Sequence, residues 1–228
     1  MLTRQRTGLS AQVHDYVKQQ LLDGEIAIGS AIPIDAIAAR LGISRQPVMD
    51  AVRRLAQDGF VDVVPQVGSF PRTYRVREIV DFFRLFAESE AVVAALAAER
   101  RDPAGIARLR QISAEIGALR GADLPEPELA RTYRKLNRRF HSEIRAMMDS
   151  SAVAEVVETM GDQSDFLASA ARAPIFMKRL DAAIDEHEQI IAAIESGDAA
   201  RAARLMRQHV LAIADRIVAS ASEPATAR

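Results

Sequence analysis

The stretch IDAIAARLGISRQPVMDAVRRLAQDGF, residues 34–60, decides the fold of the amino-terminal part of the chain. Its apolar positions follow a helical period on both sides of Gly42, and a glycine at such a point lets two short helices meet in a tight turn. Ser44 stands where the N-cap of the second helix belongs. Pro47 falls in the first turn of that helix, where its missing N–H costs little. The spacing therefore predicts a helix, a turn and a second helix.

The second helix of the pair, expected near residues 44–58, has an apolar inner face formed by Val48, Val52 and Leu55. In the DNA major groove an arginine can pair with guanine and a glutamine with adenine. Two helices joined at a glycine are also a common packing device, so this geometry alone leaves DNA binding and simple packing open. If the helix reads DNA, the candidate contacts are the side chains at its tip and on its outer face, namely Ser44, Arg45, Gln46, Met49 and Arg53.

The segment that follows favours DNA binding. DGFVDVVPQVGSFP, residues 58–71, alternates β-branched and aromatic residues around PQVG and predicts a two-stranded hairpin with Gly68 at its tip. A hairpin directly after a helix-turn-helix is a wing. The first helix of the pair is expected near residues 34–40, and another helix is expected near residues 10–23. Together with the wing they form a small amino-terminal domain.

From residue 77 onward the sequence has long helical periodicity rich in Ala, Leu, Ile and Arg, without a strand signal. We therefore predict a mostly α protein, with an amino-terminal winged helix-turn-helix and a carboxy-terminal all-α bundle. The expected parts are a DNA-binding domain over 1–72, a linker over 73–77, a helical domain over 78–220 and a disordered tail over 221–228. Breaks between the helices of the bundle are expected at RDPAG (101–105), GADLPEPE (121–128), MMDSS (147–151), ARAPIF (171–176) and ESGD (195–198).

The composition sets broad limits on the location and partners of the protein. The chain has 228 residues, no cysteine and a formal net charge of −1, so net charge gives no sign of a nucleic-acid partner. The first residues lack the apolar region of an export signal, which predicts a cytoplasmic location. AVVAALAA, at 91–98, is far shorter than the ~20 apolar residues that a membrane-spanning helix needs, so no membrane association is expected.

Three of the four histidines fall in the bundle, at His141, His187 and His209. ESGD predicts an antiparallel hairpin whose turn contains Gly197, and His187 and His209 lie at nearly equal distances from that turn. All three histidines run along apolar faces, so they are either core residues that satisfy one another or ligands of a metal ion. Three imidazoles and one oxygen ligand suit a divalent ion such as zinc or nickel.

Two groups of residues resemble the winged helix-turn-helix of the GntR family of bacterial transcription regulators. They are VHDYVKQQLLDGEIAIGS (13–30) and IAARLGISRQPVMDAVRRLAQDGFV (37–61), followed by QVGSF (66–70). The resemblance implies that Ser44, Arg45 and Gln46 at the tip of the recognition helix, and Gly68 in the wing, contact operator DNA. The chain departs from the family pattern at three positions. The family usually has Arg or Glu in place of Asp35, Arg in place of Met49, and often a basic residue or His in place of Val67. Each missing basic group removes a phosphate or base contact.

LNRRFH (136–141) and EHEQIIAAIESGDAARAARLMRQH (186–209) resemble the FCD ligand-binding domain of the FadR subfamily of these regulators. In that domain an acidic or amide residue and three histidines bind a metal ion, and a small carboxylate effector completes its coordination. The matching positions are Asn137, His141, His187 and His209, and the ion expected there is zinc, with nickel or manganese as alternatives. Phe86 replaces an arginine that often grips the effector. Three alternatives follow: Arg134 could substitute for it, the effector could be less acidic than usual, or the metal alone could hold the effector.

The resulting expectation is a cytoplasmic, homodimeric transcription regulator, most simply a repressor. It would bind double-stranded operator DNA and respond to an organic acid. The rival interpretation is a metal-dependent hydrolase that uses the same three histidines. Against it, Glu143 and Glu186 are expected to face away from the histidines, which leaves no general base. In a third interpretation the bundle only dimerises and the histidines hold no metal.

Overall fold

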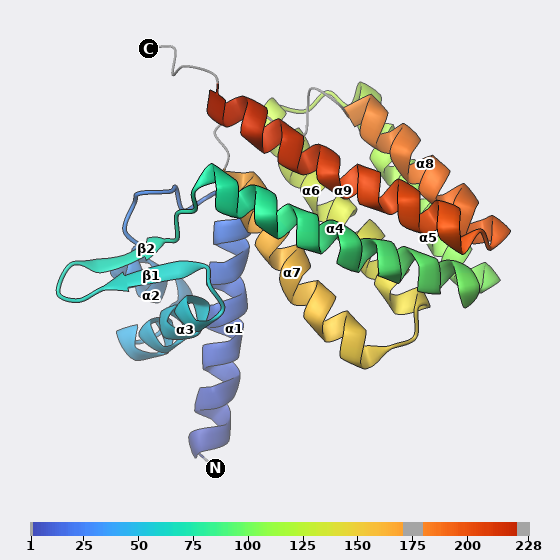
Figure 1. Ribbon diagram of the computed structural model, residues 1–228. Helices are drawn as coiled ribbons and strands as arrows, with labels where there is room; N and C mark the ends of the chain where they lie inside the picture. Colours follow the sequence, from blue (N-terminus) through green and yellow to red (C-terminus); the bar gives the residue numbers. More distant parts are fainter. Residues whose placement is uncertain (1, 171–179, 223–228) are drawn as a thin grey trace. The chain divides into compact units, whose positions relative to one another are not determined.

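Figure 1 presents the computed structural model, which describes residues 2–170 and 180–222. The chain forms two compact units. The first contains the residues up to Tyr74 together with Asp165–Ala170, and the second contains residues 75–164 and the helices after residue 180. The small sheet belongs to the first unit, and the described residues of the second unit form helices and their connections.

The first unit is a winged helix-turn-helix, as predicted. Its first helix starts at Leu2 instead of near residue 10. No proline interrupts the residues before Ser10, and the single Gly8 is not enough to end a helix. The elements of the unit are α1 (Leu2–Leu22), α2 (Ile34–Leu41), α3 (Arg45–Gln57), β1 (Val61–Val64) and β2 (Gly68–Pro71).

The turn between α2 and α3 has the predicted form. Gly42 has a φ of +65° and its N–H donates to the carbonyl groups of Ala38 and Ala39, which ends α2 in the left-handed conformation that glycine favours. Ser44 is the N-cap of α3, with extended backbone, although its side chain makes no capping hydrogen bond within the described residues. The predicted inner face of α3 is confirmed, because Val48, Val52 and Leu55 are buried.

The wing is an antiparallel hairpin in which Val61 pairs with Pro71 and Val64 pairs with Gly68. Residues 65–67 form the loop, and Gln66 has a positive φ of 63°. Gly68 is therefore the first residue of β2, and the tip of the wing lies one to three residues earlier than predicted. The left-handed conformation that a three-residue hairpin loop requires is adopted by Gln66, not by the glycine.

The core of the first unit includes Val17, Leu21 and Leu55, all fully buried. Phe166, from the last turn of α7 (Ser151–Ala170), belongs to this core as well. Its ring meets the ring of Phe60 edge to face, with centroids 5.5 Å apart. A domain boundary drawn at residue 72 leaves this contribution out, because it comes from a segment about a hundred residues further along the chain.

The second unit is the predicted helical bundle. The breaks at 101–105, 121–128, 147–151 and 195–198 separate its helices. The break expected at 171–176 lies outside the described residues, as does the expected tail from residue 223 onward. Its first helix begins at Val76, inside the segment expected as a linker. Besides α7, the helices are α4 (Val76–Glu99), α5 (Pro103–Gly117), α6 (Glu126–Met147), α8 (Leu180–Ser196) and α9 (Ala199–Ser222), with a short 3₁₀ helix at Ala118–Gly121.

Small side chains let the helices of the bundle approach closely. α4 and α9 run alongside each other and form the most extensive helix pair of the unit (Figure 1). Ala87, Ala91 and Ala94 of α4 and Ala202 of α9 are almost completely buried. α8 and α9 form the expected antiparallel hairpin. Gly197 has a φ of +73° at its turn, and the Asp198 carboxylate accepts a hydrogen bond of 2.9 Å from the Arg201 N–H.

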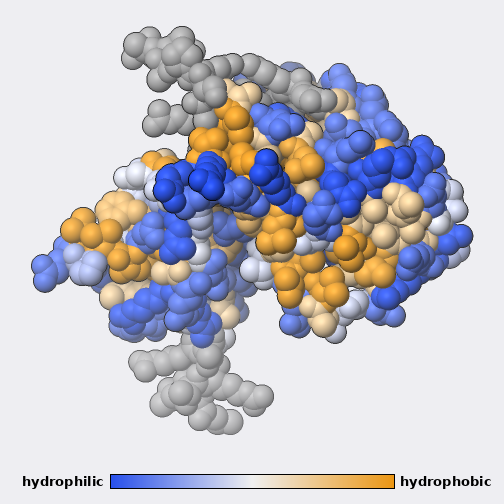
Figure 2. Space-filling model, viewed as in Figure 1, coloured by the Kyte–Doolittle hydropathy of each residue, from blue (hydrophilic) through white to orange (hydrophobic). Residues whose placement is uncertain are grey.

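The surface of the bundle carries apolar side chains on two neighbouring helices. Leu85 and Val92 on α4 are 63% and 54% exposed, and Val156 on α7 is 61% exposed. Ser89 Oγ lies 3.7 Å from Met160 Sδ, which places α4 and α7 side by side at this point. Figure 2 shows apolar residues gathered on the face of the bundle where α4 and α7 lie. Among the described residues, no helix has the length and apolar character needed to cross a membrane.

Candidate metal centre and nucleic-acid interface

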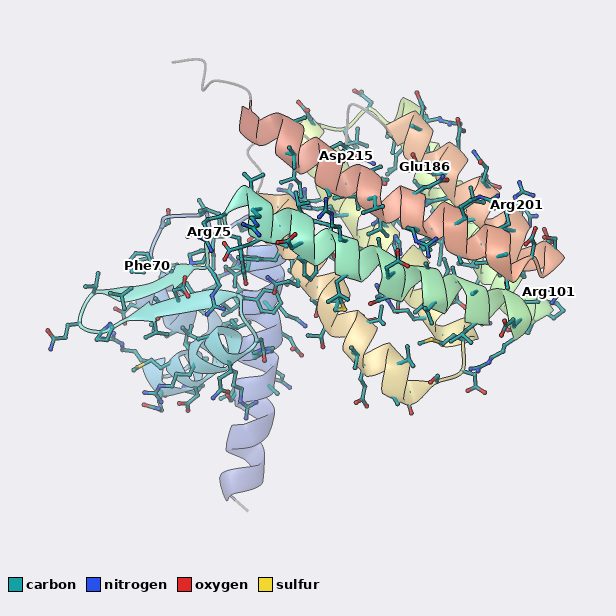
Figure 3. The ribbon with its side chains drawn as sticks, in the orientation of Figure 1. Phe70, Arg75, Arg101, Glu186, Arg201 and Asp215 are labelled. Atoms are coloured by element: carbon teal, nitrogen blue, oxygen red, sulfur yellow. The ribbon has the colours of Figure 1, made fainter. Side chains whose placement is uncertain are left out.

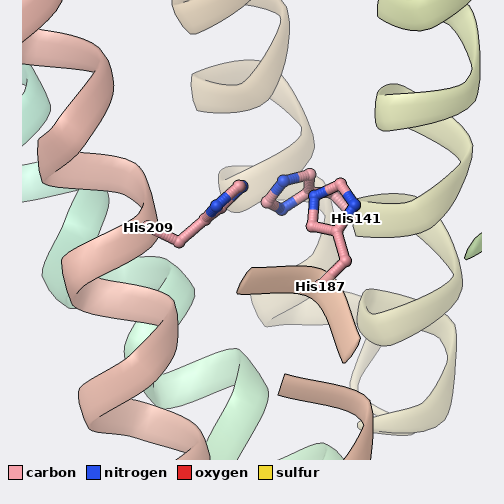
Figure 4. A group of neighbouring side chains, drawn as sticks. All are labelled: His141, His187 and His209. Carbon is pink, nitrogen blue, oxygen red and sulfur yellow. The ribbon is translucent and has the colours of Figure 1, made fainter. Parts of the chain in front are cut away.

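The three histidines of the bundle meet in its core. His141 comes from α6, His187 from α8 and His209 from α9 (Figure 4). The ring centroids of His187 and His209 lie 4.9 Å apart, and those of His141 and His209 lie 5.5 Å apart. One ring nitrogen from each residue lies within 4.8 Å of the others, close enough for the three to share one ion. The predicted alignment of His187 and His209 across the hairpin is thereby confirmed.

Several buried polar atoms of this cluster have no hydrogen-bond partner among the described residues. They are both ring nitrogens of His187, Nε2 of His209 and Oδ1 of Asn137, which lies one turn before His141 on α6. A buried polar atom without a partner costs about 1–3 kcal/mol, so four of them on the cluster and the adjoining turn of α6 call for a bound group. Imidazole nitrogens and an amide oxygen are suitable donors for a divalent transition metal, and the residues present therefore fit such an ion.

Two glutamates orient the histidine rings. Glu90 Oε2 lies 2.8 Å from Nδ1 of His141, and Glu186 Oε2 lies 2.7 Å from Nδ1 of His209. A carboxylate on Nδ1 fixes the ring and leaves Nε2 as the ligand atom, which is the usual arrangement around metal-binding histidines. Figure 3 labels Glu186 on α8, beside α9. The expectation that Glu186 faces away was wrong, because the position next to His187 on α8 is turned toward the neighbouring helix α9.

Glu90 also holds a buried arginine. Its Oε1 accepts hydrogen bonds from Nε and Nη2 of Arg145, at 3.0 and 2.7 Å, and its side chain is completely buried. Nη1 of Arg145 donates to Glu158 on α7 at 2.9 Å. Burial alone would raise the pKa of Glu90, but the hydrogen bond from His141 and the charge of Arg145 outweigh burial and lower it. Glu90 is therefore an anion at neutral pH.

Two of the three histidines have lowered pKa values, which favours their neutral form. Burial, reinforced by the nearby His209 and His141, lowers the pKa of His187 well below its ordinary value. Burial also lowers the pKa of His209, against the opposing effect of its hydrogen bond to Glu186. A neutral imidazole has a lone pair that can ligate a metal ion, so the lowered pKa values suit His187 and His209 to that role.

The other candidate residues of this site are Glu143, Phe86 and Arg134. Glu143 pairs with Arg108 at 2.7 Å and lines a groove of about 330 Å³ between α5 and α6, so it faces away from the cluster as predicted. Phe86 is buried and stacks on Phe82, with ring centroids 5.8 Å apart. Arg134 is half-buried on α6, three residues before Asn137.

In the first unit, the predicted DNA-reading side chains lie at the exposed tip and outer face of α3. Arg45 pairs with Asp35 at 2.9 Å, and Asp50 accepts hydrogen bonds from Gln46 at 2.9 Å and from Arg53 at 3.1 Å. Exposed pairs of this kind are worth little and are readily exchanged for contacts to DNA. The exposed residues are Ser44, Arg45, Gln46 and Arg53, and Met49 and Gly68 are partly buried.

A winged helix-turn-helix followed along the chain by a helical bundle indicates a class of proteins, the DNA-binding regulators. The family model for bacterial regulatory proteins of the gntR family matches residues 9–70, and the model for the FCD domain matches residues 81–212. The chain belongs to the GntR family of transcription regulators with an FCD domain. It is a regulator and not an enzyme, which sets the hydrolase interpretation aside.

Individual relatives agree with this assignment. The chain is 31% identical over 204 residues to an uncharacterized HTH-type transcriptional regulator of Streptomyces ambofaciens, covering 88% of this chain and 81% of that protein. It is 24% identical over 207 residues to a probable D-xylose utilization operon transcriptional repressor of Paenarthrobacter nicotinovorans, covering 91% and 88%. The solved structure of E. coli McbR/YncC has the same fold, with a TM-score of 0.74, 22% identity and coverage of 89% and 93%.

Proposed function

We propose that this protein is a homodimeric repressor whose binding to operator DNA is modulated by a small organic acid, bound at a divalent metal ion in the helical bundle. The observation that carries the proposal is the set of unpartnered, buried donor atoms on His187, His209 and Asn137. It supports a bound ion because a core made only for packing would not leave these atoms without partners. Relatives named as transcriptional repressors, among them the Paenarthrobacter nicotinovorans protein, support repression.

The metal ligands would be His141, His187, His209 and Asn137. Three nitrogen donors and one neutral oxygen favour zinc, with nickel or manganese as alternatives. The bound ion would supply a positive charge with exchangeable positions for an anionic effector. Because Asn137 is neutral, the site depends on the imidazoles and on Glu90 and Glu186, which hold two of them in place.

The effector would be an organic acid whose carboxylate reaches the ion. Phe86 provides no charge for it, and we propose Arg134 as the second contact, since it is half-buried on the same helix as two of the ligands. An arginine there would pair with a carboxylate group of the effector in a bidentate manner.

The DNA contacts would be made by Ser44, Arg45, Gln46, Met49 and Arg53 of α3 and by Gly68 of the wing. A homodimer would place two such helices about one DNA turn apart on a palindromic operator. The exposed apolar side chains of α4 and α7 support dimerisation, because a second copy would cover them. The location would be the cytoplasm, where the bacterial chromosome lies.

A gel-shift assay with DNA fragments from beside the gene of this protein tests the proposal. We expect one fragment to be bound at low salt by the parent, and its affinity to change when Zn²⁺ and organic acids are added. In the His187→Ala variant the fragment should still bind, but the response to the added ion and acid should disappear. If no fragment binds at low salt, or if the variant responds like the parent, the proposal is wrong.

A further inference from the structure

We propose that Arg145 is a positioning residue that couples the histidine cluster to helix α7, through Glu90 on one side and Glu158 on the other. The inference rests on the proposed metal site and adds the route by which its occupancy is transmitted. All four groups concerned, His141, Glu90, Arg145 and Glu158, lie in the second unit.

The first link of the route is the divided carboxylate of Glu90. One oxygen faces Nδ1 of His141 at 2.8 Å, and the other accepts two hydrogen bonds from Arg145 at 3.0 and 2.7 Å. The side chain is completely buried, so water cannot take over either contact. A rotation of the His141 ring that moves one carboxylate oxygen therefore moves the other as well, together with the guanidinium group of Arg145.

The second link is the close fit of Arg145 against α7. Its Nη1 donates to Glu158 at 2.9 Å, and a Cβ atom at Gly161 would lie 2.7 Å from Nη2. The guanidinium group therefore lies directly on the helix at a place where any larger residue would collide with it. Arg145 spans the gap from Glu90 on α4 to α7, and a shift of the guanidinium group shifts its contact with α7.

The charges make Arg145 the common partner of two anions. An ion bound by His141 would draw electron density through the ring from the hydrogen-bonded Glu90, which alters how firmly Glu90 holds Arg145. Glu158 competes for the same cation, and its side chain is 55% exposed, whereas Glu90 is fully buried. Occupancy of the histidine cluster should therefore change the strength of the Arg145–Glu158 contact and, with it, the stability of α7.

α7 is a suitable helix to receive such a signal. It is continuous from Ser151 to Ala170, and Asp165–Ala170 is part of the unit that holds the recognition helix. Phe166 packs there on Phe60, and Ser169 Oγ donates to the carbonyl oxygen of Leu21 at 3.1 Å. A change in the order of α7 would thus reach residues that pack in the core of the DNA-binding unit.

The point at which to interrupt the route is Glu158. Removing Glu90 or Arg145 would leave a buried charge without its partner, which costs several kcal/mol and disturbs folding. Glu158→Gln removes the charge at the exposed end and leaves the histidines and Glu90 in place. Glu155→Gln is the matched control, because it makes the same change at an exposed position of the same helix.

Hydrogen–deuterium exchange of the full chain, with and without Zn²⁺ alone, tests the coupling, and calorimetry on the same samples measures Zn²⁺ affinity. In the parent and in Glu155→Gln we expect Zn²⁺ to change the exchange rate of amides in residues 151–164 by about threefold or more. In Glu158→Gln, Zn²⁺ affinity should stay within about threefold of the parent, since the ligands are intact, while the response of α7 is lost.

Two results would overturn the inference, and they are distinguishable. If Zn²⁺ binds and the α7 response is the same in Glu158→Gln as in the parent, Arg145 does not carry the signal, and the proposed metal site stands. If the parent binds no Zn²⁺, the metal site fails and the coupling fails with it.

Discussion

Glu186 on α8 and His209 on α9 meet across the helical hairpin, with Oε2 of the glutamate 2.7 Å from Nδ1 of the histidine. The contact fixes the ring so that Nε2, which is buried and has no partner among the described residues, is the atom left for a ligand. Glu90 does the same for His141 from α4. The histidine cluster is thus held by carboxylates from the helices around it.

The first prediction concerns this contact. Glu186→Gln keeps the shape of the side chain but weakens its hold on His209, and we expect Zn²⁺ affinity to fall by about 10–100-fold. Competition with a chromophoric chelator would measure it. Asp185→Asn, which changes an exposed neighbour that pairs with Arg120, is the control and should bind like the parent. Equal affinity in both variants would mean that Glu186 does not support a ligand.

The second prediction concerns the pH dependence of the metal-free protein. The pKa of His187 in the folded state lies well below its value of about 6.5 in the unfolded chain. The unfolded state therefore binds the extra proton first as the pH falls, so the free energy of unfolding should decrease below pH 6.5, by up to about 1.4 kcal/mol per pH unit for this group.

Urea unfolding between pH 7.5 and pH 5.5, in the presence of a chelator, would measure this loss. In His187→Phe the part of the slope that is due to His187 should vanish, because phenylalanine does not titrate. The variant should still fold, because a phenyl ring can stack on Phe140 as the imidazole does, with ring centroids 4.1 Å apart in the parent. An unchanged slope in the variant would show that His187 is not the group responsible.

The third prediction concerns the recognition helix. Arg45→Ala should weaken binding to the operator by about 1–3 kcal/mol and relax its sequence preference, because we propose that this side chain pairs with a base. Fluorescence anisotropy with operator and scrambled DNA would measure both effects. Gln57→Ala, at the exposed far end of α3, is the control. A loss that is equal for both DNA sequences would assign Arg45 to the phosphate backbone instead.

The fourth prediction concerns the apolar face of α4 and α7. Leu85→Lys introduces a charge where we expect a second copy to pack, so the variant should dissociate into monomers at concentrations at which the parent is a dimer. Light scattering after size-exclusion chromatography would show it. Val67→Lys, at an exposed residue of the wing, should leave the mass unchanged. A dimeric Leu85→Lys variant would place the interface elsewhere.

The helix-turn-helix could be predicted from the sequence because its signals are local. Gly42, Ser44 and the apolar positions of α3 specify the turn and the inner face within about fifteen residues. The start of α1 could not be predicted, because no helix-breaking residue marks it. The place of Gly68 in the wing could not be predicted either, because Gln66 adopts the left-handed backbone conformation of the loop. The contribution of Phe166 to the first unit depends on tertiary packing alone.

In the candidate site, too, only the relations set by local sequence could be predicted. The hairpin turn at Gly197 fixed the relation of His187 to His209, and helical spacing joined Asn137 to His141. The partners Glu90 and Arg145 could not be found in this way, since they join α4 to α6 across more than fifty residues. Helical phase wrongly predicted that Glu186 faces away from the histidines. The side chain meets His209 because α9 packs against this side of α8, which the sequence of α8 alone does not reveal.

Native mass spectrometry of the protein, purified without chelator and supplied with Zn²⁺, tests the central claim most directly. We predict a dimer that carries one divalent ion per chain, and a His187→Ala variant that remains folded but carries none. His14→Ala, at the histidine of the first unit that pairs with Asp58, should retain the ion. A parent protein that stays free of metal, or a His187→Ala variant that binds the ion as fully as the parent, would contradict the account.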